Sequence, residues 1–326
     1  MKPRAVKGRM TERKITYLRV SVTDHCNYRC FYCMPKGMPE HLPHSEILRY
    51  EEIDTIVRAG AVFGINKVRI TGGEPLVRRD VVELVRKLQD VEGLREICMT
   101  TNGSLLAQYA RPLRDAGLGR INISVDSLIP ARFRRITGGG RLSDVFNGID
   151  AAQEAGFTNT KINVVLMRGV NDDELPRFAD FAAGHGLEVR FIEVMPLSQS
   201  VEDSAPFFIG FDEIRRRLHN LHSLERLETE PGAPAQLRYR LVGTRGIVGV
   251  IAPISRPFCA ECNRLRLSAD GRLYACLMAA AHVDVKSILR ASGGEARLID
   301  AFGRAAALKP PCHNGCSSTL MSRIGG

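Results

Sequence analysis

Short runs of branched apolar residues alternate with longer amphipathic stretches over the first 200 residues of the chain. The runs have the length and composition of buried β-strands, whereas the stretches repeat apolar residues at the spacing of a helix. This pattern predicts strands at 15–22, 67–71, 96–101, 120–125, 160–167 and 188–194, and helices at 51–63, 81–89, 104–116, 144–155 and 173–183. Repeated strand–helix units of this size predict parallel strands joined by right-handed crossovers. The predicted fold is α/β, an incomplete (β/α)6 TIM-like barrel.

The pattern changes after about residue 200. Pro231, Gly232 and Pro234 mark a loop, and the runs at 237–242 and 246–251 predict the two strands of a hairpin. The segment 264–274 predicts a second hairpin that turns at Asp270-Gly271. We therefore divide the chain into a partial barrel with a basic N-terminal arm, residues 1–200, and a smaller C-terminal α+β extension, residues 201–326.

Composition indicates a large enzyme of the cytoplasm. With 326 residues and 44% hydrophobic content, the chain can bury a sizeable core. No apolar run approaches the length that spans a bilayer, so we predict no membrane association. The nine cysteines are better explained as ligands or reduced thiols than as disulfides, because the cytosol keeps thiols reduced.

The formal net charge of +10 raises the question of a nucleic-acid partner. The basic arm at the N-terminus would suit one, but the other basic residues are scattered, and aromatic residues make up only 6% of the chain. A small polyanionic substrate explains the excess charge equally well. We therefore predict no nucleic-acid partner.

Polar residues cluster where the predicted strands end. The second, third, fourth and sixth strands are followed by Gly72-Gly73-Glu74-Pro75, Thr100-Thr101-Asn102-Gly103, Ser124-Val125-Asp126-Ser127 and Glu193-Val194-Met195-Pro196. The carboxyl ends of parallel strands lie on one face of a barrel and carry its chemistry. These segments therefore predict the position of an active site.

Three cysteines follow the first strand, at Cys26, Cys30 and Cys33, with the spacing C-x3-C-x2-C. Three thiolates can hold three corners of a cubane iron–sulfur cluster and leave the fourth iron open to another ligand. Disulfides are disfavoured because the number is odd and no signal peptide precedes the motif. Zinc is the main alternative, although no fourth cysteine or histidine stands at the usual spacing.

A second trio, Cys259, Cys262 and Cys276, lies in the extension with the spacing C-x2-C-x13-C. By itself it fits a zinc ribbon without its fourth ligand as well as it fits a cluster. Two incomplete cysteine sets in one chain favour two clusters. Cys312 or Cys316 could offer a fourth thiolate, but we interpret both as free thiols, and Cys98 as a core residue.

These motifs resemble a known superfamily. Cys26-x3-Cys30-x-Tyr32-Cys33, together with Gly72-Gly73-Glu74-Pro75, is similar to the radical S-adenosylmethionine (SAM) superfamily. The second trio with Asn263-Arg264-Leu265-Arg266, and the terminal Gly325-Gly326, resemble the GTP 3′,8-cyclase family of molybdenum cofactor biosynthesis. The resemblance extends from about Lys14 to Gly326.

The resemblance implies a lyase with SAM and two 4Fe-4S clusters as cofactors. A 5′-deoxyadenosyl radical would remove hydrogen from C3′ of GTP, giving (8S)-3′,8-cyclo-7,8-dihydroguanosine 5′-triphosphate while guanine ligates the free iron of the second cluster. The implied partners are an unidentified electron donor and the downstream cyclic pyranopterin monophosphate synthase. The enzyme would be a monomer or a homodimer.

The resemblance also implies roles for individual residues. Besides the first cysteine trio, the catalytic residues would be Arg19, Gly325 and Gly326. The SAM contacts would come from Tyr32, Gly72, Gly73, Glu74, Ser124 and Met195, where the glycines would permit close approach to the ligand. The GTP contacts would come from Arg19, Lys67, Arg69, Thr100, Lys161, Arg190, Arg264, Leu265 and Arg266.

Two alternatives remain at this point. A radical SAM maturase with an auxiliary cluster, acting on a peptide, would share the first motif but lack Arg264-Leu265-Arg266 and the diglycine end. A zinc-dependent nucleic-acid-binding protein would explain the charge and the cysteines but not Gly72-Gly73-Glu74-Pro75.

Overall fold

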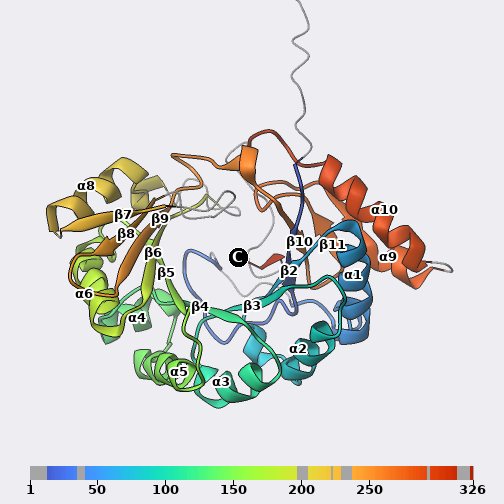
Figure 1. Ribbon diagram of the computed structural model, residues 1–326, viewed down its shortest axis with the longest axis horizontal. Coiled ribbons are helices and arrows are strands. Elements are labelled where there is room, and N and C mark those ends of the chain that lie inside the picture. The colour runs from blue at the N-terminus through green and yellow to red at the C-terminus, as the bar shows by residue number, and fades with distance from the viewer. Residues whose placement is uncertain are drawn as a thin grey trace, which may run out of the picture.

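The structure is a computed structural model (Figure 1). It describes residues 13–34, 41–196, 205–221, 223–228, 237–291, 294–313 and 324–325. Within these residues, none of the helices combines the length and the apolar composition of a membrane-spanning segment.

Six parallel strands form the centre of the sheet, in the order in which they occur along the chain. They are β1 (Tyr17–Ser21), β2 (Lys67–Thr71), β3 (Glu96–Thr101), β4 (Arg120–Ser124), β5 (Lys161–Leu166) and β6 (Glu188–Glu193). Each predicted strand is confirmed. The helices between them are α1 (Tyr50–Phe63), α2 (Val81–Gln89), α3 (Leu106–Asp115), α4 (Pro130–Thr137), α5 (Leu142–Glu154) and α6 (Leu175–His185).

Helix α4 is an addition to the predicted helices. It begins with Pro130 at its first position, where the missing N–H group costs nothing. It ends at Gly138, whose φ of 68° lies in the left-handed region that glycine adopts readily. Short 3-10 helices, labelled η, stand at His44–Glu46 (η1), Pro75–Val77 (η2), Asp172–Glu174 (η3), Ala205–Phe207 (η4) and Cys259–Glu261 (η5).

The C-terminal residues extend this sheet at both of its edges. Strand β9 (Ile247–Ile251) pairs in parallel with β6, and β10 (Arg264–Leu267) pairs in parallel with β1. Both predicted hairpins are confirmed, because β8 (Leu237–Leu241) is antiparallel to β9 and β11 (Arg272–Tyr274) is antiparallel to β10. The remaining elements are β7 (Leu224–Leu227), β12 (His282–Asp284), α8 (Phe211–Leu221), α9 (Val285–Arg290) and α10 (Gly294–Ala307).

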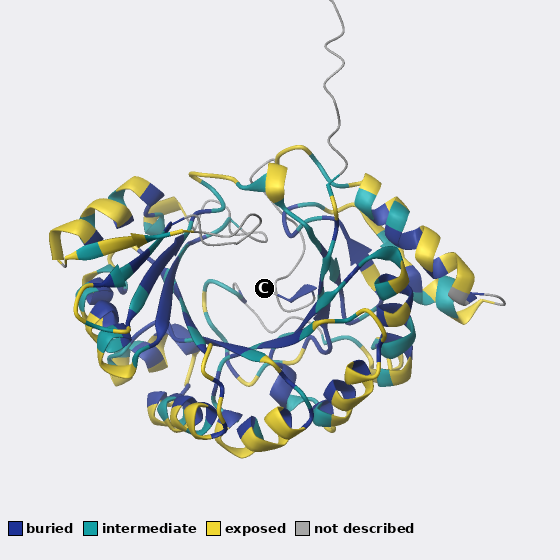
Figure 2. Cartoon of the chain, in the orientation of Figure 1, coloured by how far each residue is buried: buried dark blue, intermediate teal, exposed yellow. Residues whose placement is uncertain are grey.

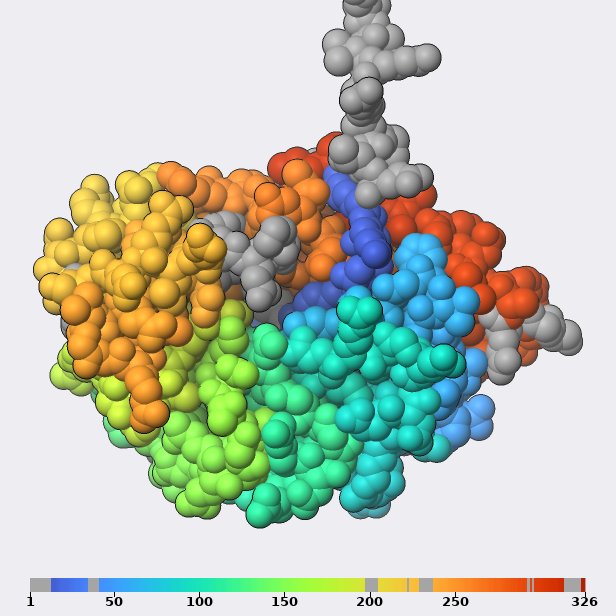
Figure 3. Space-filling view, viewed as in Figure 1, coloured from blue at the N-terminus to red at the C-terminus, as the bar shows by residue number. Residues whose placement is uncertain are grey.

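The sheet is an open barrel, as predicted. Its strand order begins at β12 and ends at β7, so the two edges do not pair with each other. In the space-filling view, the orange and red C-terminal residues adjoin both the yellow end of the barrel and the blue first strand (Figure 3). The C-terminal region therefore shares one sheet with the barrel. The division at residue 200 remains a prediction.

The helices cover the outer face of the sheet (Figure 1), and the strands beneath them are mostly coloured as buried (Figure 2). On β1, Leu18 and Val20 are fully buried in the hydrophobic core, together with Ile53 and Ile56 of α1. Because side chains alternate across a strand, the residues between them face the inside of the barrel. This alternation decides which side chains can form the site.

Glu193, at the end of β6, connects the barrel to the C-terminal region. Its carboxylate accepts hydrogen bonds from the backbone N–H groups of Phe211 (2.9 Å), Ile254 (2.9 Å) and Ser255 (3.0 Å), and from the Ser255 hydroxyl. The side chain is fully buried. One carboxylate thus fixes the start of α8 and the loop that follows β9.

We expect Glu193→Ala to lower the free energy of unfolding by at least about 2 kcal/mol, because it leaves several buried N–H groups without their acceptor. Urea denaturation of the anaerobically purified protein, followed by circular dichroism, measures the effect. Glu225→Ala, at a β7 position whose side chain is 63% exposed, is the matched control. Equal midpoints for the two variants would contradict this role of Glu193.

Candidate active site

A cavity of about 650 Å³ lies inside the barrel. Its wall combines inward-facing residues of the barrel strands with residues of the C-terminal region. Eight of the predicted GTP contacts line it: Arg19, Lys67, Arg69, Thr100, Lys161, Arg190, Arg264 and Arg266. The structure therefore brings together residues that are up to 247 positions apart in the sequence.

Three arginines stand side by side across neighbouring strands in this wall. Arg19 on β1 is in register with Arg266 on β10 at one side and with Arg69 on β2 at the other. Burial, followed by the nearby Arg266, lowers the pKa of Arg19 to about 9. Burial and Arg264 likewise lower the pKa of Arg266 to about 10. A polyanion in the cavity would relieve this repulsion.

Arg69 is held in place by neutral partners. Its Nε donates to the Tyr17 hydroxyl at 2.6 Å, and another guanidinium nitrogen donates to the Met99 carbonyl at 2.9 Å. Tyr17 stands one row below the arginines, in register with Lys67 and Arg264. The wall therefore has two rows of inward-facing side chains, with Arg266, Arg19 and Arg69 in one row and Arg264, Tyr17 and Lys67 in the other.

Two glutamates, which the sequence analysis did not identify, neutralise other cations of the wall. Glu96 binds Lys67 at 2.5 Å and Arg120 at 2.6 Å. Glu188 binds Lys161 at 2.9 Å, Arg190 at 2.6 Å and Arg238 at 2.9 Å. Burial alone would raise the pKa of Glu188, but Arg190 and Lys161 lower it to about 2. Lys67 and Lys161 face these carboxylates across the strand register.

The Leu265 side chain, within the predicted substrate segment Arg264-Leu265-Arg266, does not face the cavity. It lies between Arg264 and Arg266 on β10, so strand alternation turns its side chain to the opposite face. There it is fully buried in the hydrophobic core. It supports the two arginines and does not line the cavity.

The first cysteine trio lies in the loop after β1. A tight turn, in which the N–H groups of Cys33 and Met34 both donate to the Cys30 carbonyl at 2.9 Å, shapes this loop. The three side chains are partly buried. Burial raises the pKa of Cys26 to about 11 and that of Cys33 to about 12, and it raises the pKa of Cys30 as well.

This environment fits a metal cluster. Protein groups alone do not stabilise the three thiolates, whereas bound metal ions would deprotonate the thiols and supply the positive charge they need. Asn102 donates to the Cys26 sulfur at 3.9 Å, and the Tyr28 N–H donates to it at 3.4 Å. Such hydrogen bonds to a ligating sulfur tune cluster potentials.

The predicted SAM contacts divide into two groups. Tyr32, Ser124 and Met195 line the cavity. Asp126, which was not among the predicted contacts, joins them and accepts a 2.6 Å hydrogen bond from the Tyr32 hydroxyl. Burial raises the pKa of Asp126 to about 6.

Gly72, Gly73 and Glu74 form the second group, and none of them lines the cavity. A Cβ atom on Gly73 would lie 2.3 Å from the His25 carbonyl oxygen, so this glycine lets the end of β2 approach the cysteine loop closely. A Cβ on Gly72 would meet the Thr23 carbonyl at 2.7 Å.

The Glu74 carboxylate is also committed to protein partners. It accepts hydrogen bonds from Leu76 N–H at 3.0 Å, from the Thr101 hydroxyl at 2.7 Å and from Asn102 N–H at 2.6 Å. Burial raises its pKa to about 7. Its carboxylate therefore joins the ends of β2 and β3, and a SAM contact by this segment remains a prediction.

The second trio lines the same cavity as the arginines. Burial by itself would raise the pKa of Cys262, but Lys309 and Arg264 outweigh it and lower the pKa below its usual value. Lys309 is fixed by 2.7 Å hydrogen bonds to the carbonyls of Arg264 and Ala275. A thiol that ionises readily next to two partly buried thiols fits a metal or cluster site.

The two trios lie at opposite ends of one strand pair. Cys26 follows β1, whereas Cys262 precedes β10, which runs parallel to β1. The row of arginines therefore lies between the two cysteine sites.

Cys312 is a fourth thiol beside the second trio. Burial raises the pKa of Cys259, and the nearby Cys312 thiol, which forms a hydrogen bond with it, raises it further. Cys98 is fully buried, as predicted. Cys316 lies outside the described residues.

The C-terminus reaches the arginine wall. The Gly325 carbonyl accepts a hydrogen bond from Arg266, and its φ of 70° is in the left-handed region. A side chain here would overlap the Thr71 hydroxyl, so the position requires glycine. Gly326 lies outside the described residues.

Two protein-family models match this chain. The model of the Radical SAM superfamily matches residues 20–182, and the model named Molybdenum Cofactor Synthesis C matches residues 187–315. A solved structure, SuiB of Streptococcus suis bound to S-adenosylmethionine, has a TM-score of 0.61 at 12% identity and covers 89% of this chain and 66% of its own. The open barrel and its first cysteine trio thus define a radical SAM protein.

Three curated relatives show which family of radical SAM proteins the chain belongs to. The GTP 3′,8-cyclase of Thermodesulfovibrio yellowstonii is 45% identical, covering 96% of this chain and 98% of the relative. That of Moorella thermoacetica is 47% identical, with 97% and 98% covered. GTP 3′,8-cyclase 1 of Pseudomonas aeruginosa is 46% identical, with 92% of each covered. The chain belongs to the GTP 3′,8-cyclase family.

Proposed function

We propose that the cavity binds GTP and that the chain converts it into (8S)-3′,8-cyclo-7,8-dihydroguanosine 5′-triphosphate. The observation that carries the assignment is the row of Arg266, Arg19 and Arg69 between the two cysteine sites. Guanidinium groups bind phosphate oxygens in pairs of parallel hydrogen bonds. A triphosphate would place negative charge beside these crowded cations.

The first site would hold one 4Fe-4S cluster on Cys26, Cys30 and Cys33, with SAM beside Tyr32, Ser124 and Met195. When bound, these groups supply the carbon radical that removes hydrogen from C3′ of GTP. The role of the protein is to hold C3′ within reach and to exclude water. Tyr32 is fixed for this purpose by its hydrogen bond to Asp126.

The second site would hold the other 4Fe-4S cluster on Cys259, Cys262 and Cys276. Guanine would bind on its open side, since these thiols and the arginines line one cavity. GTP would then be held at two points, with its guanine base at the second cluster and its triphosphate along the arginine wall. In this proposal Cys312 leaves the open position to guanine.

The resemblance to the GTP 3′,8-cyclase family and the composition of the chain extend this proposal. The enzyme would take its electron from a donor that is still to be identified and pass its product to cyclic pyranopterin monophosphate synthase. It would act in the cytoplasm, as a monomer or a homodimer, without a nucleic-acid or membrane partner.

A variant that lacks one cysteine of the second trio distinguishes the roles of the two sites. We expect Cys276→Ala to retain about four of about eight irons and to cleave SAM to 5′-deoxyadenosine, but to form no cyclised product. Iron analysis and chromatography after anaerobic incubation with GTP, SAM and dithionite measure this. Cys98→Ala, in the core of β3, is the control and should retain both activities. Cyclised product from Cys276→Ala would refute the second-site role.

The affinity for GTP should also depend on pH through Lys161. Burial, followed by Arg190, lowers the pKa of Lys161 to about 8. Its cation is therefore complete below that pH and is lost as pH rises, so the dissociation constant for GTP should rise by up to about tenfold per pH unit above pH 8.

Calorimetric titration of the cluster-loaded protein between about pH 7 and 9.5 tests this dependence. Lys161→Arg is the matched variant, because a guanidinium has a higher ordinary pKa than an ammonium and every other cation of the wall is the same in both proteins. Its affinity should stay level to a higher pH. Identical pH profiles for the two proteins would exclude Lys161 as the titrating group.

A further inference from the structure

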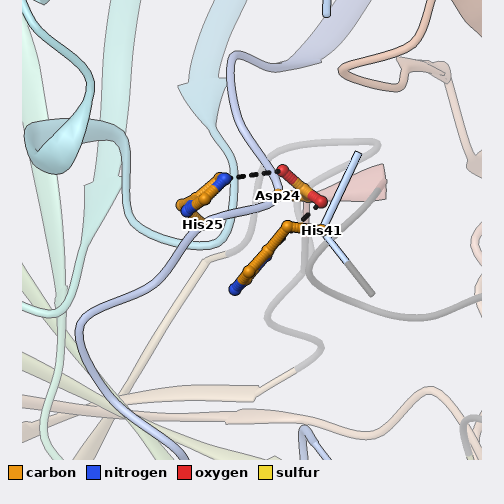
Figure 4. A group of neighbouring side chains, drawn as sticks. All are labelled: Asp24, His25 and His41. Carbon is orange, nitrogen blue, oxygen red and sulfur yellow. Dashed lines mark ion pairs between the residues drawn. The ribbon is translucent and has the colours of Figure 1, made fainter. Parts of the chain in front are cut away.

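Asp24, His25 and His41 form a cluster outside the cavity, at the point where β1 leads into the cysteine loop (Figure 4). Two ion pairs converge on the Asp24 carboxylate, one from each histidine (Figure 4). His25 Nε2 lies 3.8 Å from Oδ1, and His41 Nδ1 lies 3.6 Å from Oδ2. The three ligand atoms all lie within 4.8 Å of one another.

Hydrogen bonding does not account for this cluster. Asp24 is only 2% exposed, and among the described residues its Oδ1 has no hydrogen-bond partner. The His41 Nδ1 is likewise buried without one, whereas Asp24 Oδ2 accepts a hydrogen bond from Leu42 N–H at 2.7 Å. Burying a carboxylate oxygen and a ring nitrogen without hydrogen bonds costs free energy.

The geometry leaves room for an ion between these atoms. The distances of 3.6 and 3.8 Å are too long for hydrogen bonds. Donor atoms around a tetrahedral zinc ion stand about 3.3 Å apart, given bond lengths of about 2.0–2.1 Å. The two rings are stacked, with centroids 3.9 Å apart, so ion binding would turn the rings out of this stack until both nitrogens point at the ion. The His25 side chain is 52% exposed and opens the site to solvent.

We propose that Asp24, His25 and His41 bind one divalent transition-metal ion of the zinc class. The donor set of two imidazoles and one carboxylate suits such an ion and leaves a position for water. This site is separate from both cysteine sites and does not depend on the proposed function.

The ion would stabilise the loop that carries Cys26. Asp24 and His25 are the residues whose carbonyl oxygens contact Gly73 at the end of β2. Residue 41 approaches from a different segment, and the ion would join the two. Its role is to position the cysteine loop, and it takes no part in the reaction.

Zinc binding to the cluster-loaded enzyme tests the proposal. Iron and sulfide analysis first confirms that the cysteine sites are loaded, and a chelator then removes loosely bound metal. Competition with a chromophoric chelator should show one zinc ion per chain, bound with a micromolar or lower dissociation constant. His25→Ala and His41→Ala should each weaken binding at least tenfold. His44→Ala, an exposed position on η1, is the matched control and should leave binding unchanged.

X-ray absorption at the zinc edge identifies the ligands independently of the variants. The proposal requires a shell of nitrogen and oxygen at about 2.0–2.1 Å, without sulfur at about 2.3 Å. A sulfur shell, zinc binding that survives both histidine substitutions, or the absence of bound zinc would each overturn it.

Discussion

The structure depends on one electrostatic constraint, which is the crowding of positive charge inside the barrel. Arg266, Arg19 and Arg69 stand on adjacent strands, and strands in a sheet lie only about 4.8 Å apart. Their mutual repulsion and their burial act in the same direction, and both lower the pKa of Arg19. The surrounding sheet tolerates this arrangement because hydrogen bonds and an apolar outer face hold each strand in place.

The counterions within the wall are distributed unevenly, and this shapes the site. Glu188 gathers three cations at the amino end of β6, and Glu96 holds two at the amino end of β3. Neither glutamate pairs with the row of Arg266, Arg19 and Arg69. The crowded cations of that row would attract anionic substrate groups, between a radical-generating site and a second cysteine site. The C-terminal region completes the site. Its strand β10 contributes Arg266, at one end of the arginine row, and its Lys309 favours the ionised form of Cys262.

Local sequence patterns were sufficient for the strands, the cysteine motifs and the inward cations. Alternation alone places Arg19, Lys67 and Arg69 inside, and the same rule, applied to β10, would have placed the Leu265 side chain on the outer face. The counterions were missed because pairing Lys161 with Glu188 requires the register between two strands, which no single segment encodes. The same is true of Glu74, whose partners come from the end of β3, and of His41, which reaches Asp24 from another segment. The attachment of β9 and β10 to opposite barrel edges is likewise a long-range property.

In the proposed mechanism, the first cysteine site generates a radical aimed at C3′ of a GTP molecule held by the arginine wall. GTP deuterated at C3′ tests this step, in anaerobic incubation with SAM, dithionite and the cluster-loaded enzyme. We expect 5′-deoxyadenosine that carries the deuterium, formed together with cyclised product, as mass spectrometry would show. Unlabelled 5′-deoxyadenosine accompanying the cyclised product would contradict it.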